Sequence, residues 1–539
     1  MSTFVAAALI WALLPAKAIL GAIPAVPQAP DLEQLKLQAQ QAPSDPMAHF
    51  RRGVALYHAG DIDRAADEFR ATIKLNPNIP EAHNNLGTIQ RQRGKLGDAI
   101  QEFRSALKVR PEFLGARYNL ILALVANNQA GAAKGEAEQA LAANPQWALG
   151  HYSLGLAQER LGSIGAADTA FRRALELDPK MATAWYQLGQ LAVRRGQTTA
   201  AIQDFQNTAA LDPQSADAYF ALGSQLLQTA DIGAAREAFQ RAAALRPHDA
   251  DIHYQLGVIA EREANPQAAI SEYRQAIAAN PRTLTARVAL ARVEGREGDA
   301  DAALADIQSV LQVEPQNAQA HETYGEMLRR RGEVPQAIQE LELANRLDSK
   351  LPSAHVELGL ALEAKGDLTG AEEELRQAIA LDAKDKRSHL ALASLLRRQG
   401  ETQGAAGEAA VAEKLSQDEI NNSSARGANR SGVELAGKQQ WDAAIEQFRK
   451  ALELQPGLSA AQFNLAGALL EAGRLPEAAE EFRRLLAKYP EWPQAHYQFG
   501  NVLEKQGKVA QACREYKAAL GLDPDLLAAR DALKSTSCQ

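Results

Sequence analysis

Histidine is the residue type in this chain whose spacing first suggests chemistry. Eight of the ten histidines are separated by multiples of 34 residues, apart from one shift of five residues before the last of them. Neutral imidazole is the commonest metal ligand in proteins, so a regular series of this kind is a candidate metal array. The eight residues are His49, His83, His151, His253, His321, His355, His389 and His496.

The same period of 34 residues governs alanine along almost the whole chain. A fixed period of this length indicates a solenoid built from one supersecondary unit repeated in tandem. Counting 34 positions from Pro46 places these alanines at position 20 of fourteen repeats, with five extra residues between the eleventh and the twelfth. They are Ala65, Ala99, Ala133, Ala167, Ala201, Ala235, Ala269, Ala303, Ala337, Ala371, Ala405, Ala444, Ala478 and Ala512.

Three further positions fit two helices joined by a short turn. Position 8 is Gly or Ala in thirteen of the fourteen repeats, the exception being Ile121, and small residues there and at position 20 let two helices approach closely. Position 24 usually carries a large apolar residue such as Phe103, one helical turn beyond the alanine. Position 32 is Pro in eleven repeats, which ends the second helix. Glycines such as Gly60 and Gly94 are expected as left-handed caps between the helices.

This pattern resembles the tetratricopeptide repeat family, whose consensus places Trp, Leu-Gly, Tyr, Ala, Phe and Pro in the same order. The resemblance covers Pro46 to Pro524, although the consensus Trp at position 4 is present only as Trp185. It implies an all-α, right-handed superhelical solenoid of helix-turn-helix units. Residues 525–539 are expected to provide a capping helix and tail, because the last apolar face would otherwise meet water.

The repeat changes the interpretation of the histidines, all eight of which occupy position 4. Equivalent residues of adjacent repeats are separated by a packed helix layer of about 10 Å, whereas ligands lie roughly 2 Å from a shared zinc ion. We therefore expect no metal site and no cofactor, and we interpret these histidines as packing residues in place of the family's Trp.

Aromatic residues at position 5 are the main candidates for ligand binding. The resemblance implies that first helices line a concave groove, into which positions 2, 5, 9 and 12 look. Rings with polar tips suit extended peptides, although they could equally pack only against their own neighbours. Two asparagines at position 6 form part of the ladder seen in long arrays of the O-linked N-acetylglucosamine transferase type. The candidate groove residues are Tyr118, Tyr152, Tyr186, Phe220, Tyr254, Asn85 and Asn119.

Composition and motifs argue against catalysis and against a nucleic-acid partner. The net charge is −8, and Lys and Arg are interspersed with Asp and Glu without a basic run. No phosphate loop, dinucleotide fingerprint, nucleophile elbow or metalloprotease helix is present. Only residues 1–45 lie outside the array and its cap, so we expect no catalytic residues and no enzyme activity.

The N-terminal segments and one break complete the expected organisation. An apolar run from Phe4 to Leu14 is too short to span a bilayer and suits a secretory signal over residues 1–18, although no Lys or Arg precedes it. Residues 19–45 are a Pro/Ala/Gln-rich lead-in.

The array then comprises eleven repeats at 46–415 and three at 425–524, with an irregular junction or hinge expected at 416–430. The alternative is a longer second helix and a longer loop, without a hinge. Cys513 is interpreted as a small buried hydrophobe, with a disulfide to Cys538 left open.

These features predict a non-catalytic scaffold that binds proteins or peptides in a concave groove, with no integral membrane span. Two alternatives remain: a targeting or regulatory subunit of an enzyme such as a glycosyltransferase, or an exported assembly factor for envelope or secretion machinery. Export to the bacterial periplasm or the extracellular space is favoured over the cytoplasm. The partner, the pathway and the oligomeric state do not follow from the sequence.

Overall fold

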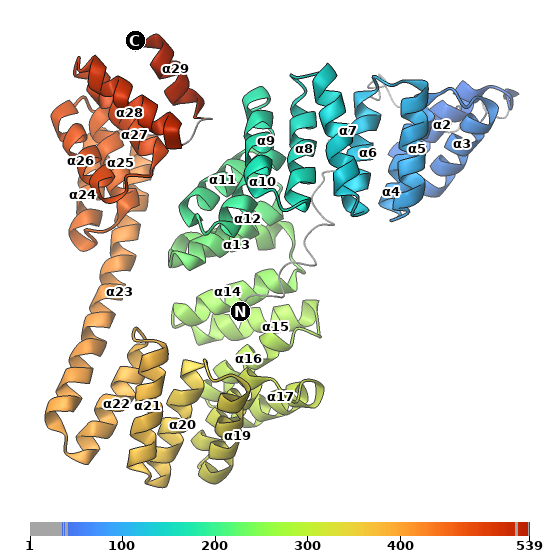
Figure 1. Cartoon of the computed structure of the whole chain (residues 1–539). Coiled ribbons are helices and arrows are strands. Elements are labelled where there is room, and N and C mark those ends of the chain that lie inside the picture. The colour runs from blue at the N-terminus through green and yellow to red at the C-terminus, as the bar shows by residue number, and fades with distance from the viewer. Residues whose placement is uncertain (1–34, 36, 38–40, 523–525, 537, 539) are drawn as a thin grey trace. The chain divides into compact units, whose positions relative to one another are not determined.

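The computed structural model describes residues 35, 37, 41–522, 526–536 and 538, and the regular structure in them is helical (Figure 1). The expected signal segment 1–18 and most of the lead-in therefore lie outside the described residues. The chain divides between Leu222 and Gly223 into two compact units, a boundary that falls within one helix.

Helix pairs follow one another along the first unit with the predicted period. They are α2 (Pro46–His58) and α3 (Ile62–Leu75), α4 (Pro80–Gln92) and α5 (Leu96–Val109), α6 (Leu114–Ala126) and α7 (Ala130–Ala143), α8 (Ala148–Arg160) and α9 (Ile164–Leu177), and α10 (Ala182–Arg194) and α11 (Thr198–Leu211). The boundary lies in α12 (Ala216–Gln228), which is followed by α13 (Ile232–Leu245).

The second unit continues the same alternation to the end of the chain. Its helices are α14 (Ala250–Arg262) and α15 (Pro266–Ala279), α16 (Leu284–Glu297) and α17 (Ala300–Val313), α18 (Ala318–Arg330) and α19 (Val334–Leu347), α20 (Pro352–Lys365) and α21 (Leu368–Leu381), α22 (Lys386–Gln399), α23 (Thr402–Gly437), α24 (Trp441–Leu454), α25 (Ser459–Glu471) and α26 (Leu475–Lys488), α27 (Pro493–Lys505) and α28 (Val509–Leu522), and α29 (Leu527–Ser535).

The core of each repeat forms where its two helices cross. The position-20 alanines are fully buried in thirteen repeats, and the remaining one, Ala405, is 3% exposed. The position-24 rings, such as Phe103, are also buried, and all except Phe482, whose repeat has Ala466 at position 8, lie directly over the position-8 glycine of their own repeat. A Cβ atom added to Gly87 would stand 2.8 Å from the Cε1 atom of Phe103, so ring and glycine together set the distance between the helices.

Repeat three shows that this contact is a matter of volume. Ile121 replaces the small residue at position 8, and position 24 of the same repeat is Ala137 instead of a ring. Both side chains are fully buried in one cluster. The large and small partners have therefore exchanged helices, which keeps the space between them filled at close to constant volume.

The turn between the two helices is also uniform. Position 15 has a positive φ in all fourteen repeats: it is Gly in ten of them and Asn128, Ala230, Ala264 or Gln439 in the others. Glycine adopts this left-handed conformation without steric cost, which confirms the expected caps at Gly60 and Gly94.

Residues 416–430 differ from the sequence-based expectation of an irregular junction. They lie inside α23, an uninterrupted helix of 36 residues that serves as second helix of repeat eleven and first helix of repeat twelve. The segment contains no proline, so nothing in it removes a helical hydrogen bond, and the five extra residues extend the helix instead of forming a loop. Gly432 still contacts Phe448, so repeat twelve keeps the register expected for it.

The C-terminal end is tied by a covalent bond. Helix α29 packs on α28, and Cys513 of α28 forms a disulfide with Cys538, their Cα atoms lying 5.7 Å apart. The Thr536 hydroxyl also donates a hydrogen bond of 2.8 Å to Glu504. Cys513 is buried, as interpreted from the sequence, but as half of a disulfide and not as a free thiol.

We expect Gly87→Ile to lower the free energy of unfolding by about 1–3 kcal/mol, because the added side chain overlaps the Phe103 ring. Combining it with Phe103→Ala should recover much of the loss by recreating the pairing of repeat three. Thermal unfolding followed by circular dichroism measures both effects.

Gly135→Ile is the matched control, because Gly135 lies mid-helix on the surface with no atom within 4 Å of an added Cβ. Its unfolding temperature should stay level or rise slightly, since Ile is a better helix former than Gly. Equal losses at the two glycines would show that the ring contact does not set the helix spacing.

Candidate functional site: the inner face of the helix array

Contacts between repeats identify one side of the array as its inner face. In the runs α4–α6–α8, α16–α18–α20–α22 and α23–α25–α27, consecutive first helices pack directly on one another. A row of helices that converge on one side makes that side the inside of the curve. We call the surface formed by the first helices the inner face.

The predicted aromatic row lies on these first helices, but most of its rings are buried. Tyr118, Tyr152 and Tyr186 are 7%, 2% and 9% exposed, and Phe220 and Tyr254 are half-buried. The Tyr152 ring packs 5.7 Å from that of Phe171 between centroids, and the Tyr186 and Tyr254 rings make equivalent contacts. The row therefore contributes to the core of each repeat, and a binding role for it stays a prediction.

Burial also fixes the protonation state of these tyrosines. It raises the pKa of Tyr152 to about 12, with hydrogen bonds to Gln187 and Thr183 acting in the opposite direction. Burial likewise raises the pKa of Tyr118. Both phenols are neutral at physiological pH and can serve only as hydrogen-bonding groups.

The predicted asparagines contact each other through an intermediate residue. Asn119 Nδ2 donates to Asn84 Oδ1 at 2.9 Å, and Asn84 Nδ2 donates to Asn85 Oδ1 at 3.4 Å. Asn119 is 1% exposed, so this chain of amides holds α4 against α6. The same geometry recurs where Asn464 Nδ2 donates to Asn429 Oδ1 at 3.1 Å.

The inner face of repeats eight to eleven is strongly charged, which sequence reasoning missed. Glu326 of α18 is 1% exposed and receives hydrogen bonds of 2.9 and 3.1 Å from Arg296 of α16, while Arg330 binds the same carboxylate at 3.1 Å. Glu357 of α20 is fully buried and binds both Arg329, at 2.9 Å, and Arg387 of α22. We call these sets the two Arg–Glu–Arg triads.

The triad carboxyl of Glu326 is ionised despite its burial. Burial opposes ionisation of Glu326, but the hydrogen bond and charge of Arg296 outweigh it and lower the pKa of that carboxyl. Glu322 lies nearby without such a pair, and burial raises its pKa to about 7, against a hydrogen bond from Ser353 and the charge of Arg292. The pKa of Glu322 therefore lies well above that of the triad carboxylate Glu326, which remains charged at neutral pH.

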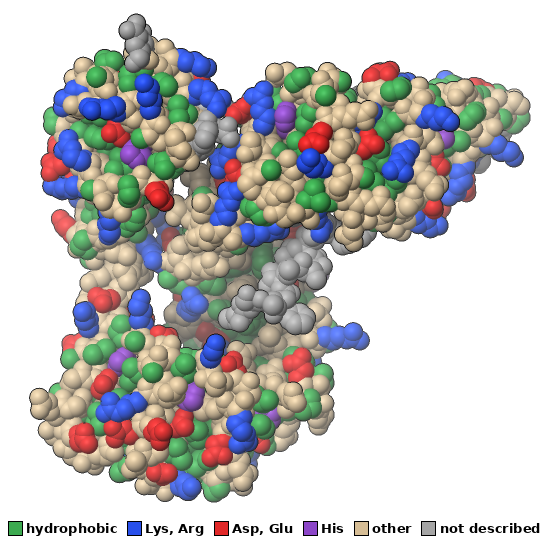
Figure 2. Space-filling model, in the orientation of Figure 1, with side chains coloured by type: hydrophobic (Ala, Val, Ile, Leu, Met, Phe, Trp, Pro, Cys, Tyr) green, Lys and Arg blue, Asp and Glu red, His purple; other side chains and the backbone are tan. Residues whose placement is uncertain are grey.

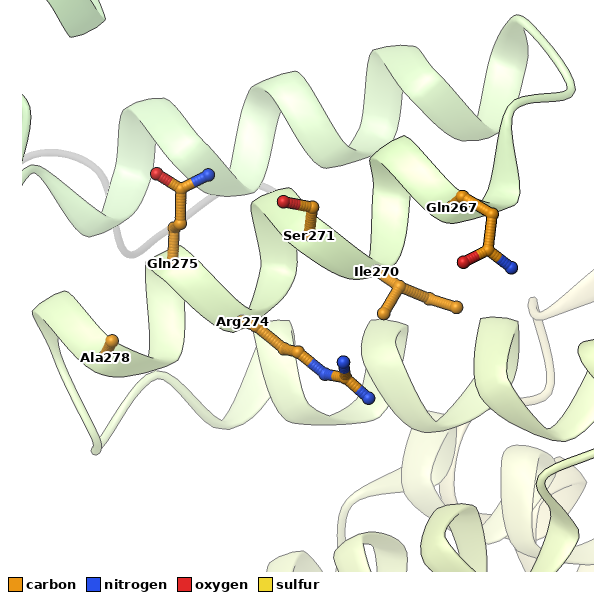
Figure 3. A pocket seen from close by; sticks show the side chains of 6 residues that line it. All are labelled: Gln267, Ile270, Ser271, Arg274, Gln275 and Ala278. Carbon is orange, nitrogen blue, oxygen red and sulfur yellow. The ribbon is translucent and has the colours of Figure 1, made fainter.

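The other surfaces of the described residues show less organisation. Figure 2 shows basic and acidic side chains interspersed over the visible face. A shallow hollow on α15 is lined by Gln267, Ile270, Ser271, Arg274, Gln275 and Ala278, all from that one helix (Figure 3).

Among the described residues, no group of three or more His, Cys, Asp or Glu side chains could hold a metal ion. None of the described helices is long and apolar enough to cross a bilayer.

Comparison with known proteins decides the family. The profile named Tetratricopeptide repeat matches residues 34–77, 59–117, 118–182, 154–216, 186–231, 220–282, 288–352, 356–419 and 430–495, and a second profile of the same name matches 493–526. The chain belongs to the tetratricopeptide repeat family.

Several solved structures are also similar to this tetratricopeptide repeat chain, all with TM-scores below 0.5. The Cut9–Hcn1 hetero-tetramer of APC/C matches at 15% identity and a TM-score of 0.37, covering 94% of this chain and 99% of that one. Yeast Tom70 matches at 14% identity and 0.34, covering 80% and 96%. MamA matches at 28% identity and 0.29, covering 30% and 95%. No curated protein matches the sequence.

The histidines stand where the tetratricopeptide consensus has Trp, and they join three segments. In seven repeats the position-4 histidine contacts the glutamate at position 23 through Nδ1, at 2.6–2.7 Å. In the same seven repeats Nε2 faces the backbone carbonyl oxygen six residues earlier, in the loop entering the repeat, at 2.9–3.4 Å. We call this arrangement the histidine clamp. The expectation that these histidines only pack was therefore incomplete.

The clamp requires a charged histidine to be complete. Both ring nitrogens face acceptor oxygens, and a neutral imidazole can donate from only one nitrogen. For His83, the hydrogen bond that its Nδ1–H donates to Glu102 raises the pKa, with burial acting against it and the Pro77 carbonyl adding to it. Where position 4 is arginine, a carboxylate at position 23 still pairs with it, as in Arg117 with Glu136 and Arg287 with Asp306. In seven of the eight repeats with histidine at position 4, position 23 is Glu, and the exception is His151 with Ala170. This association of His with Glu was the signal available in the sequence.

The His83 clamp predicts a stability that falls as pH rises. Because the folded-state pKa lies above the unfolded value of about 6.5, the contribution is fully present below pH of about 6.5 and is lost as pH rises through the folded-state pKa. We expect His83→Gln to lower stability by about 1–2 kcal/mol in mild acid and by less above the folded-state pKa. Urea unfolding of both proteins across this range measures the difference.

His151→Gln is the matched control, since His151 keeps only the Pro145 carbonyl, at 2.9 Å. Its effect on stability should be smaller than that of His83→Gln in mild acid. The same pH dependence for both variants would contradict a role for the glutamate.

Proposed function

We propose that this protein is a non-catalytic scaffold that binds extended segments of partner proteins along its inner face. The observation that carries this proposal is the direct packing of consecutive first helices in runs such as α4–α6–α8 and α16–α18–α20–α22. Within such a run, side chains at equivalent positions of successive repeats form rows that an extended chain can follow. Membership of the tetratricopeptide repeat family supports the proposal, because such arrays generally serve protein–protein interaction and not catalysis.

The inner face offers two chemistries to a partner. In repeats three to five, the first helices carry half-buried apolar side chains such as Leu156, which packs in one cluster with Tyr118 and Tyr152, and Val193 of α10. In repeats eight to eleven, the two Arg–Glu–Arg triads replace this apolar surface. A nucleic acid is the less suitable partner, because the chain carries a net charge of −8 and its acidic side chains are interspersed with the basic ones.

Placing charge on the apolar part of the inner face tests the proposal. We expect the double variant Leu156→Glu/Val193→Glu to lose at least about tenfold of the partner protein recovered by affinity purification, because burying a carboxylate against an apolar partner is costly. Quantitative mass spectrometry of the captured proteins from the native host provides the measurement, with circular dichroism confirming that helicity is retained.

The matched control places two glutamates on second helices. Val109 and Leu211 are 38% and 40% exposed at the ends of α5 and α11. Val109→Glu/Leu211→Glu should recover the same partners as the natural protein. Equal loss in both variants would indicate a general effect of charge, and equal recovery would exclude this part of the inner face.

Export is the compartment that we propose for this scaffold. The Cys513–Cys538 disulfide supports it, because disulfides persist in oxidising compartments and are rare in the cytosol. An exported assembly factor for the cell envelope is the second candidate function on the same ground. The intact mass of the protein purified from its host should show loss of the segment near residue 18 and one disulfide. A full-length chain with two free thiols would contradict export.

A further inference from the structure

Each of the two Arg–Glu–Arg triads contains one arginine more than is needed to neutralise its buried glutamate. One arginine is enough to pair a buried carboxylate, yet Glu326 binds both Arg296 and Arg330, and Glu357 binds both Arg329 and Arg387. Each triad therefore carries a net charge of about +1, in a chain whose total charge is −8. This excess is local and is built into the packing of the first helices.

The glutamates and the arginines of the triads lie at different depths below the protein surface. The glutamates are 1% and 0% exposed, whereas the side chains of Arg296, Arg330 and Arg387 are 38–39% exposed. The carboxylates thus lie below the surface and the guanidiniums form it. A guanidinium carries five N–H donors, and the hydrogen bonds from Arg296 to Glu326 use two of them.

Burial of the glutamates also orients the arginines. An exposed arginine loses side-chain entropy when it binds a ligand, but these guanidiniums are already held by charge-assisted hydrogen bonds of 2.9–3.2 Å. The charge of Arg387 also acts on Glu326, so the two triads are neighbours. Nearby acidic groups oppose part of this excess: the charge of Asp385 acts on Arg387, whereas Glu363 is paired with Arg398 and Glu322 has a pKa of about 7.

We propose that the two triads form a binding site for an acidic, extended segment of a partner protein. The inference rests on the proposed scaffold function and assigns the chemistry of the ligand in this part of the array. Side-chain carboxylates accept paired hydrogen bonds from guanidinium groups, which makes Asp and Glu the natural complement of this surface. Two net charges suit a short peptide segment better than the dense phosphate backbone of a nucleic acid.

Geometry sets the length of the segment. The triads join four consecutive first helices, α16, α18, α20 and α22. With about 8–10 Å between neighbouring helix axes, they span about 24–30 Å. An extended chain advances about 3.3 Å per residue, so eight or nine residues cover the site.

The test uses the full-length protein and a fluorescent peptide of about ten residues that alternates Glu and Ser. Both peptide ends are blocked, so that side-chain carboxylates and not a terminal one are measured. We expect binding that weakens as salt rises and that is lost when Gln replaces Glu in the peptide. No binding at low salt, equal binding of the Gln peptide, or tighter binding of a single-stranded RNA of similar length would overturn the inference.

The variant Arg330→Gln/Arg387→Gln removes the excess charge while leaving one arginine on each buried glutamate. We expect it to bind the Glu peptide about tenfold more weakly, since two of the positive charges that attract the peptide's carboxylates are lost. The control Arg449→Gln/Arg484→Gln removes equal charge from α24 and α26, where both arginines pair with exposed or half-exposed glutamates. It should bind as the natural protein does, and equal weakening in both variants would overturn the inference.

Failure of this inference and failure of the scaffold proposal have different signatures. If the natural protein and Arg330→Gln/Arg387→Gln recover the same partners equally well, the scaffold remains and the acidic-segment site is excluded. If the natural protein recovers no partner, the scaffold proposal itself fails.

Discussion

The contact between a small residue at position 8 and a large one at position 24 is the constraint on which the rest of the structure depends. It sets the distance between the two helices of each repeat, and this distance determines how neighbouring repeats pack on one another. Glycine under an aromatic ring is the usual solution, and Ile121 over Ala137 is the reversed one. The volume between the helices is therefore what is preserved, more than the identity of either side chain.

Once the helices are close, polar interactions can join neighbouring segments. The histidine clamp ties the first helix, the second helix and the entering loop in seven repeats. The other seven repeats lack the His–Glu pair. Among them are repeats four to six, where positions 4 and 23 carry His151 with Ala170, Trp185 with Asp204, and Tyr219 with Ala238. Buried Asp204, which has no clamp histidine, has its pKa raised to about 7 by that burial. The array is thus uniform in its apolar core and variable in its polar reinforcement.

Sequence predicts the fold well because a fixed period repeats each structural requirement many times. It predicts the inner face less well. Whether Tyr152 points into a groove or packs on Phe171 depends on small rotations that no pattern of residue types records. The triads could not be predicted for another reason. Arg296 and Arg329 bind glutamates that occupy different positions in their repeats, so no single pair of repeat positions carries the Arg–Glu pattern. The histidine clamp could have been found, because seven of the eight repeats with His at position 4 have Glu at position 23.

Helix α23 has a consequence for how this array could change over time. A loop absorbs an added residue locally, but a continuous helix transmits it, turning everything beyond by about 100° and advancing it by about 1.5 Å. The 36 residues of α23 therefore set the rotational phase of the last three repeats against the preceding ones. Insertions in other linkers would alter a loop, whereas an insertion here would re-aim a whole binding surface.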